Sequence, residues 1–263
     1  MTIQKWLQGL MIISISLFGV LLLVFVCWYQ LKIIHDEPKP IVGRDLRHHR
    51  DKKHAIIPRT VPDYTLPPVV GGIPPLITNI PTKQPVVFLG IDDGAYKDPS
   101  VIKIIKDNHI KASLYIAKFF TANNPAFFKE IVKTGSLVEN HTLSHDLHMT
   151  RTMTYEQQKA EICGMADYEQ QVYGRRPIFF RPPGGAYSAS LMRAAGACGM
   201  RAVVNWIALA GGGVMQYQIG DKLRPGDVVL MHFRPEFLKD MQAFIDAQNA
   251  AGLHTELLED WVG

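Results

Sequence analysis

From residue 86 onward, short apolar runs alternate with segments of helical periodicity, and this alternation restricts the fold more than any other feature of the sequence. Short apolar runs are typical of buried strands, and apolar residues spaced three and four apart are typical of amphipathic helices. The predicted strands are 86–91, 111–116, 136–139, 178–181, 201–206, 228–233 and 254–258. The predicted helices are 101–108, 125–133, 154–173 (with Thr154 as N-cap), 188–198 and 236–251. This order favours an α/β domain with a largely parallel sheet.

An apolar run near the amino terminus predicts a membrane anchor at residues 1–34. Residues 10–29 are almost wholly apolar, and a helix needs roughly 20 apolar residues to cross the hydrocarbon core of a bilayer. A cleaved signal peptide is the alternative, but its apolar region would be shorter and would end in small residues. This run ends in Cys27, Trp28 and Tyr29, so the sequence favours an uncleaved anchor.

Residues 35–83 are predicted to form a proline-rich, basic linker between the anchor and a domain at 84–263. Ten of the 17 prolines lie between residues 35 and 85, and prolines keep such a stretch extended. More basic residues follow the apolar run than precede it, which by the positive-inside rule favours a cytoplasmic domain. The chemistry described below favours an extracytoplasmic domain, so charge alone leaves the orientation open.

The overall charge and the cysteines place weaker limits on function. A net charge of +4 over 263 residues does not argue for a nucleic-acid partner, and we expect a monomer. Three cysteines are too few for a disulfide scaffold. Cys163 and Cys198 could pair if the domain is exported, and two buried free thiols are the alternative.

Polar residues follow several of the predicted strands, where functional residues of α/β domains collect. Asp92 and Asp93 end the first strand, and because adjacent residues alternate in direction, one could bind a metal while the other reaches water or substrate. His141 and His145, four residues apart, are predicted to share a helical turn. Together Asp93, His141 and His145 form a ligand set typical of catalytic zinc, with ferrous iron as the alternative.

Two further motifs end later strands. In the run 181–185, prolines fix the backbone and glycines leave N–H groups exposed, which is suited to an oxyanion hole. Arg181 would stay charged and could hold a carboxylate in place. A rigid turn without a chemical role is the alternative. His232, at the end of strand 228–233, is a candidate general acid, and a capped core histidine is the alternative.

The order of these motifs resembles that of the NodB-type polysaccharide deacetylases, carbohydrate esterase family 4. Members carry T-F-D-D-G, H-[ST]-x-x-H, R-x-P-x-G, an Asp/Trp motif and L-x-H, in that order. Four of the five match between residues 84 and 258: Ile91-Asp92-Asp93-Gly94, His141-Thr142-Leu143-Ser144-His145, Arg181-Pro182-Pro183-Gly184-Gly185 and Leu230-Met231-His232. The resemblance implies a distorted (β/α) barrel with fewer repeats than the eight-fold form.

The resemblance also implies a role for each motif residue. Asp92 would be the general base that activates water, with Arg181 orienting it, and His232 would be the acid that protonates the departing amine. The metal ligands would be Asp93, His141 and His145, with zinc as the default. Three residues would form the oxyanion and substrate pocket: Gly184 through its backbone N–H, Leu230 and Trp206.

The sequence departs from the family pattern at three places. Gly90 and Ile91 stand where Thr and Phe are usual, which the sequence suggests is a tolerated packing difference. Gly184 stands where Tyr is common, which removes a side-chain wall but leaves the backbone N–H. Segment 203–209 contains a tryptophan but no aspartate, and in the family that aspartate tunes the acid histidine through the arginine.

We therefore expect a membrane-anchored, metal-dependent enzyme that removes N-acetyl groups from a cell-envelope glycan such as peptidoglycan. A catalytically silent glycan-binding domain is the main alternative, motivated by the missing aspartate and by Gly184. Glycoside hydrolysis by paired carboxylates is a third hypothesis, but it leaves both histidines unexplained. Ferrous oxygenase chemistry is weaker still, since only Arg181 suggests a site for a 2-oxoacid.

Overall fold

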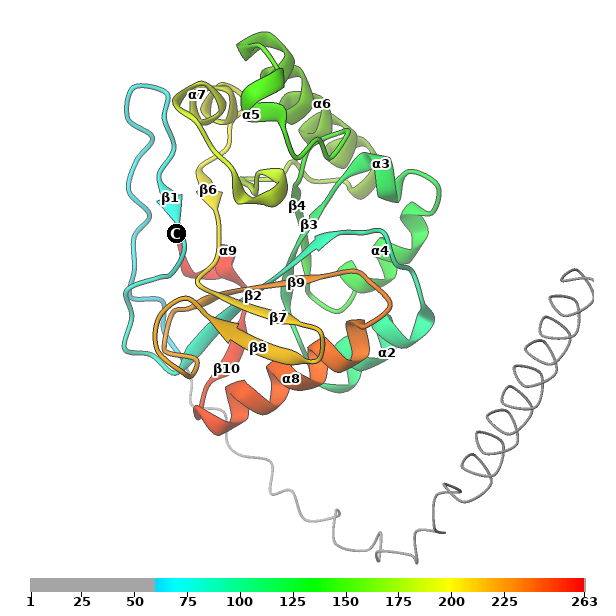
Figure 1. The fold of residues 1–263 in the computed structure, drawn as a ribbon, viewed down its shortest axis with the longest axis vertical. Helices are drawn as coiled ribbons and strands as arrows, with labels where there is room; N and C mark the ends of the chain where they lie inside the picture. The colour runs from blue at the N-terminus through cyan, green and yellow to red at the C-terminus, as the bar shows by residue number, and fades with distance from the viewer. Residues whose placement is uncertain (1–59, 263) are drawn as a thin grey trace, which may run out of the picture. The chain divides into compact units, whose positions relative to one another are not determined.

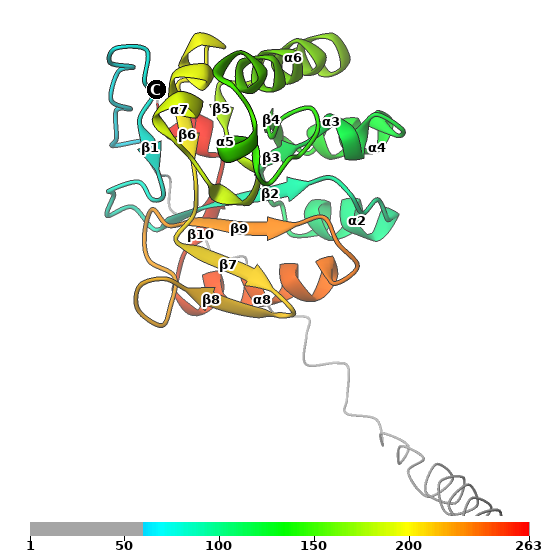
Figure 2. The same cartoon turned by 45° about the horizontal axis from the view of Figure 1, so that its top comes forward.

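The computed structural model describes residues 60–262, in which one curled, ten-stranded sheet is covered by helices (Figures 1 and 2). The strand order is β1-β6-β5-β4-β3-β2-β9-β7-β8, with β10 also paired to β2. All pairs are parallel except β7–β8. The strands are β1 (Leu76–Ile77), β2 (Val86–Asp93), β3 (Ala112–Ile116), β4 (Leu137–Asn140), β5 (Phe179–Phe180), β6 (Ala202–Val204), β7 (Ala208–Gly211), β8 (Val214–Tyr217), β9 (Val228–His232) and β10 (His254–Glu256).

Within residues 60–262, the connecting helices include all five that the sequence predicts and four short elements that it does not. They are α2 (Pro99–Asp107), α3 (Lys118–Thr121), α4 (Pro125–Val132), α5 (Met149–Thr152), α6 (Tyr155–Tyr173), the 3-10 turn η2 (Pro183–Gly185), α7 (Ala189–Ala197), α8 (Phe237–Ala250) and α9 (Leu258–Trp261). Thr154 is the N-cap of α6, as predicted, and forms a capping box with Gln157. The sequence prediction of an α/β domain with a largely parallel sheet is confirmed.

The sheet curls into a half-barrel that stays open, because β1 and β8 form its two ends within residues 60–262. β9 pairs with Phe88–Asp92 on one edge of β2. The other edge is shared, since β10 pairs with Val86–Phe88 and β3 with Leu89–Asp93. The expectation of a distorted barrel therefore holds only as an open, curled sheet.

Both faces of the sheet are buried. Alternate residues of β2 point to opposite faces, so Val87, Leu89 and Ile91 pack in the cluster that includes α4 and α8 residues. Phe88 faces the inside of the curl, where its ring meets Trp261 of α9 with centroids 5.8 Å apart. Gly90 and Asp92 share the inner face with Phe88 by the same alternation.

Helix α9 is held in this interior by charged groups. Arg175 contacts Glu259 of α9 and donates to Glu139 of β4 at 3.3 Å. The other oxygen of Glu139 accepts from the Phe179 N–H at 2.9 Å. These hydrogen bonds offset the burial of the Glu139 carboxyl group, and the arrangement ties α9 to the strand that leads to His141.

The predicted linker requires a correction, because part of it belongs to the domain. β1 pairs with β6 in parallel, and Leu66, Ile77 and Ile80 are buried in the inner cluster. A two-residue strand at the sheet edge tolerates the prolines that surround it. The domain therefore begins well before residue 84. Residues 35–59 of the linker and the predicted anchor lie outside the described residues. No helix within residues 60–262 is long and apolar enough to cross a membrane.

The hairpin of β7 and β8 was not predicted from the sequence. Its turn residues Gly212 and Gly213 both have positive φ, 68° and 77°, as a two-residue turn between antiparallel strands requires. The predicted last strand also ends early, at Glu256, because α9 starts at Leu258.

A disulfide joins Cys163 of α6 to Cys198 at the end of α7, which decides between the two alternatives that the sequence left open. The two cysteines are 35 residues apart in the sequence. Closing a loop of this length stabilises a fold by about 3–4 kcal/mol in the chain-entropy model.

We expect a variant with both Cys163→Ala and Cys198→Ala to unfold with a free energy about 3 kcal/mol lower than the wild type, because its unfolded chain is less constrained. Urea unfolding followed by circular dichroism measures this difference. A reducing agent should lower the stability of the wild type and leave that of the double variant unchanged. Equal midpoints for oxidised and reduced wild type would contradict the prediction.

Candidate metal centre and active site

The polar motifs meet at the carboxyl edge of the parallel sheet. Asp92 and Asp93 end β2, and His232 ends β9 directly beside Asp92 in the register of the two strands. His141 follows β4 and Arg181 follows β5. Parallel strands present their carboxyl ends on one side of a sheet, so loops far apart in sequence converge there.

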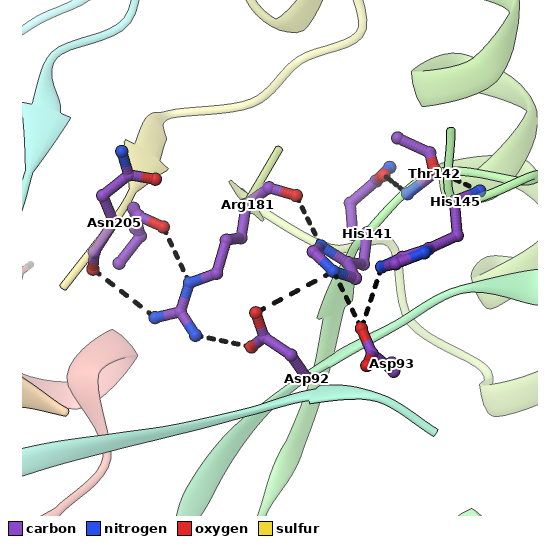
Figure 3. A network of polar contacts seen from close by, with 9 residues as sticks. Asp92, Asp93, His141, Thr142, His145, Arg181 and Asn205 are labelled. Atoms are coloured by element: carbon purple, nitrogen blue, oxygen red, sulfur yellow. Dashed lines mark hydrogen bonds and ion pairs between the residues drawn. The ribbon is translucent and has the colours of Figure 1, made fainter. Parts of the chain in front are cut away.

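Asp93, His141 and His145 form a compact group of candidate metal ligands (Figure 3). Oδ1 of Asp93 lies 2.9 Å from His145 Nε2 and 3.4 Å from His141 Nε2. One donor atom from each of the three residues lies within 4.8 Å of the others. Donors that share a zinc ion lie about 2 Å from it, so this spacing fits a single divalent metal.

The orientation of the His141 ring also fits metal binding. Its Nδ1 lies 2.7 Å from the carbonyl oxygen of Arg181, which can only accept a hydrogen bond. The ring proton therefore sits on Nδ1, and the lone pair of Nε2 faces Asp93 and His145. A carbonyl that fixes the tautomer of a ligand histidine in this way is a common feature of metal sites.

The two histidines approach each other through a loop, which corrects the prediction of a shared helical turn. Thr142 and His145 have left-handed φ values of 74° and 60°. Asn140 Oδ1 accepts from the Thr142 N–H, and Thr142 Oγ1 accepts from the His145 N–H, both at 3.0 Å. These side-chain bonds hold the backbone in a conformation that costs about 1–3 kcal/mol per residue.

Asp93 is also left-handed, with a φ of 74°. This break in the strand geometry lets both adjacent aspartates approach His141, since Asp92 Oδ2 lies 3.8 Å from His141 Nε2. Burial raises the pKa of Asp93, but hydrogen bonds and charge from His141 and His145 outweigh burial and hold the pKa well below its usual value. Asp93 is therefore ionised, as a metal ligand must be.

Asp92 is held by Arg181 inside the curl of the sheet. Arg181 Nη1 donates to Asp92 Oδ1 at 2.5 Å, and the guanidinium is fully buried. Its Nε donates to the Val204 carbonyl at 2.9 Å, and its Nη2 lies 3.5 Å from the Asn205 carbonyl (Figure 3). The guanidinium thereby fixes the position of the Asp92 carboxylate, the group that would accept a proton from water.

His232, the candidate general acid, has no supporting partner at one of its ring nitrogens within residues 60–262. Its Nδ1 is buried and has no hydrogen-bond partner among the described residues. Asn205, directly before Trp206, occupies the segment in which the aspartate is missing. The Asn205 side chain instead donates to the Gly185 carbonyl at 3.0 Å and joins two loops of the site.

The three predicted pocket residues lie around the same edge. Leu230 is buried on β9, opposite Gly90 of β2. Gly184 has a positive φ of 66°, which a tyrosine would adopt only with strain. Trp206 lies against Gly185, where a Cβ would come within 2.7 Å of the indole ring. The sequence missed Tyr115, whose ring lies 3.9 Å from the Arg181 guanidinium carbon, because an aromatic residue in a buried strand normally indicates packing.

A family model and several curated proteins match this part of the chain. Residues 79–203 match the family model for polysaccharide deacetylase. An uncharacterized protein of Streptomyces coelicolor is 37% identical over 161 residues, which cover 60% of this chain and 63% of the relative. A peptidoglycan-N-acetylglucosamine deacetylase of Bacillus cereus is 23% identical over 59% of this chain and 75% of its own. This chain thus spans somewhat less than two thirds of the Streptomyces relative.

Solved structures share the fold. A family 4 carbohydrate esterase from Streptomyces lividans, in complex with acetate, superposes with a TM-score of 0.59, 23% identity and coverage of 69% of this chain and 97% of that one. A family 4 pseudoenzyme from Bacillus anthracis superposes with a TM-score of 0.60, 19% identity and coverage of 72% and 69%. The segment 79–203 is therefore a domain of the polysaccharide deacetylase family, and the chain shares the fold of family 4 carbohydrate esterases.

Proposed function

We propose that the protein is a metal-dependent hydrolase that removes N-acetyl groups from a cell-envelope glycan, with peptidoglycan or another N-acetylglucosamine polymer as substrate. The observation that carries the proposal is the position of the Asp92 carboxylate. It is held by Arg181 and lies beside the ligand group of Asp93, His141 and His145. The family membership and the Bacillus cereus relative support the substrate class. When bound there, zinc would acidify a water molecule and polarise the acetyl carbonyl.

The residues around the candidate metal ligands would carry out the remaining steps of the reaction. Asp92, held in place by Arg181, takes the proton of the attacking water. The Gly184 N–H, which makes no hydrogen bond within the described residues, can donate to the developing oxyanion. His232, beside Asp92 in the sheet, delivers a proton to the departing amine. Leu230 and Trp206 would border the acetyl group.

We also propose that the domain acts outside the cytoplasm, held by an anchor at residues 10–29. The disulfide between Cys163 and Cys198 supports this location, because disulfides persist in oxidising compartments and are rare in the cytosol. A glycan of the cell envelope would be accessible there.

Acetate release tests the proposal directly. The purified chain, loaded with zinc, would be incubated with peptidoglycan and with N-acetylglucosamine oligomers, and released acetate would be measured enzymatically. We expect release that depends on the metal and on Asp92. Release no greater than that of an Asp92→Asn variant, on every acetylated glycan tried, would contradict the proposal.

A glycan-binding domain without turnover is the second candidate. The observation that favours it is the unpartnered, buried Nδ1 of His232, since an acid without a partner has no fixed orientation. The similarity to a pseudoenzyme concerns the fold alone. Binding to peptidoglycan in pull-down experiments, with no acetate released by the zinc-loaded chain, would favour this candidate.

A further inference from the structure

We propose that Gly90 and Tyr115 are positioning residues that place Arg181 against Asp92. This inference rests on the proposed function, in which Asp92 is the general base. It reverses the sequence-based interpretation of Gly90 as a tolerated packing difference.

The space above Gly90 is occupied by the Arg181 guanidinium. A Cβ at position 90 would lie 2.5 Å from Nη2 and 2.8 Å from Cζ, and nearer still to Nη1. Nonbonded heavy atoms normally approach to about 3.5–4.0 Å. The φ of Gly90 is not in the left-handed region, so the position requires glycine for its lack of a side chain, and not for its backbone conformation.

Tyr115 provides the aromatic surface for the same guanidinium. The Arg181 Cζ lies 3.9 Å from the centroid of the Tyr115 ring, a cation–π distance. Tyr115 and Asp92 are partners in the register of β2 and β3, so the ring lies beside the carboxylate that Arg181 binds. Tyr115 is fully buried, which strengthens the interaction by excluding water.

The Arg181 guanidinium cannot easily move aside to make room for a larger residue at position 90. It is fully buried, and its three nitrogens face three separate acceptors: the Asp92 carboxylate and the carbonyls of Val204 and Asn205. Moving the guanidinium by the roughly 1 Å that a methyl group needs would break bonds that have no replacement in a buried site.

A double-mutant cycle between positions 90 and 181 tests this placement. We expect Gly90→Ala to lower kcat by about 100-fold, with KM changed less than about three-fold and zinc content unchanged, because only the orientation of Asp92 is lost. Arg181→Lys should cause a loss of similar size. If Gly90 acts through Arg181, the double variant should be less than about three-fold slower than Arg181→Lys alone. Losses that multiply would overturn the inference.

The chain offers a matched control in Gly211. It is also a strand glycine under an arginine, since a Cβ there would lie 2.6 Å from Arg234 Nη2. The side chain of Arg234 is 35% exposed, however, and can move into solvent. Gly211→Ala should therefore keep kcat within about two-fold of the wild type. An equal loss in Gly211→Ala and Gly90→Ala would show a general effect of β-strand glycines and overturn the inference.

The tyrosine is tested separately, in case Gly90→Ala fails to fold. Tyr115→Phe retains the ring and removes a hydroxyl that has no hydrogen-bond partner among the described residues, so kcat should stay within about two-fold. Tyr115→Leu removes the cation–π surface and should lower kcat at least about ten-fold. Equal kcat values for the two variants would overturn the role assigned to Tyr115.

The cycle has a second readout that does not need activity. The same four proteins are unfolded in urea, and the shift in midpoint caused by Gly90→Ala is compared between the wild-type background and the Arg181→Lys background. We expect a clear downward shift in the wild-type background and less than half of it with Arg181→Lys, because the shorter side chain leaves room for the methyl group. A wild type that releases no acetate but shows this coupling would refute the proposed function and keep the placement. Equal shifts would refute the placement.

Discussion

Asp92→Asn is expected to lower acetate release by at least about 10³-fold, the largest effect of any substitution outside the metal ligands. Asparagine has nearly the same shape and can still accept a hydrogen bond from Arg181, but its amide cannot accept a proton from water. General base catalysis contributes about 10²–10⁴-fold, and the loss of a buried negative charge next to Arg181 adds to this. The measurement is kcat/KM on an N-acetylglucosamine oligomer.

Two controls make this result specific. The zinc content of Asp92→Asn should equal that of the wild type, because Asp92 lies outside the group of ligand atoms that lie within 4.8 Å of one another. The variant should also remain folded at the assay temperature, as circular dichroism would show, although its melting temperature should fall because the buried Arg181 loses its charged partner. If Asp92→Asn retained more than about a tenth of the wild-type rate, Asp92 would not be the general base. The attacking water would then lose its proton to another group.

His141→Ala is expected to abolish stoichiometric zinc binding and, with it, activity. His141 is buried, and its Nε2 faces Asp93 while its Nδ1 is held by the Arg181 carbonyl. Removing one of three protein ligands leaves two, and we expect the affinity for zinc to fall by more than about 100-fold, because changes to residues that only support the ligands already cost 10–100-fold. Metal analysis after dialysis, and zinc titration with a competing chelator, measure the change.

His148→Ala is the matched control for this prediction. His148 lies three residues beyond His145 and is exposed, with its ring bonded to Arg151 at 2.7 Å. It lies outside the candidate ligand group, so its removal should leave one zinc per chain and full activity. The wild type should also gain thermal stability on adding zinc, whereas His141→Ala should not. Zinc retained equally by both variants would mean that the metal binds elsewhere.

Much of the fold follows from local patterns in the sequence. The longer helices after residue 86, and the strands other than the β7–β8 hairpin, were predicted within a few residues. Each carries its own periodicity and caps, as with Thr154 at the start of α6. β1 was not predicted, because it has only two residues, which lie between prolines and show no periodicity of their own. They pair only because β6 offers an edge to them.

The sequence determined by itself which groups are available for chemistry: Asp92 and Asp93 after one strand, the histidine pair after another, and Arg181 and His232 at later strand ends. Their alignment at one edge follows from the parallel sheet, which the alternation of strands and helices already indicates. The roles of these residues stay predictions until the variants above are measured.

Only the tertiary structure decided how these groups meet. Arg181 and Asp92 are 89 residues apart and their strands are separated by two others, a spacing of about 14 Å in a flat sheet. The curl of the sheet and the length of the arginine close that distance to a hydrogen bond. Gly90 and Tyr115 acquire their proposed roles only there, because a missing Cβ or a buried ring has no chemical meaning until a guanidinium occupies the space beside it.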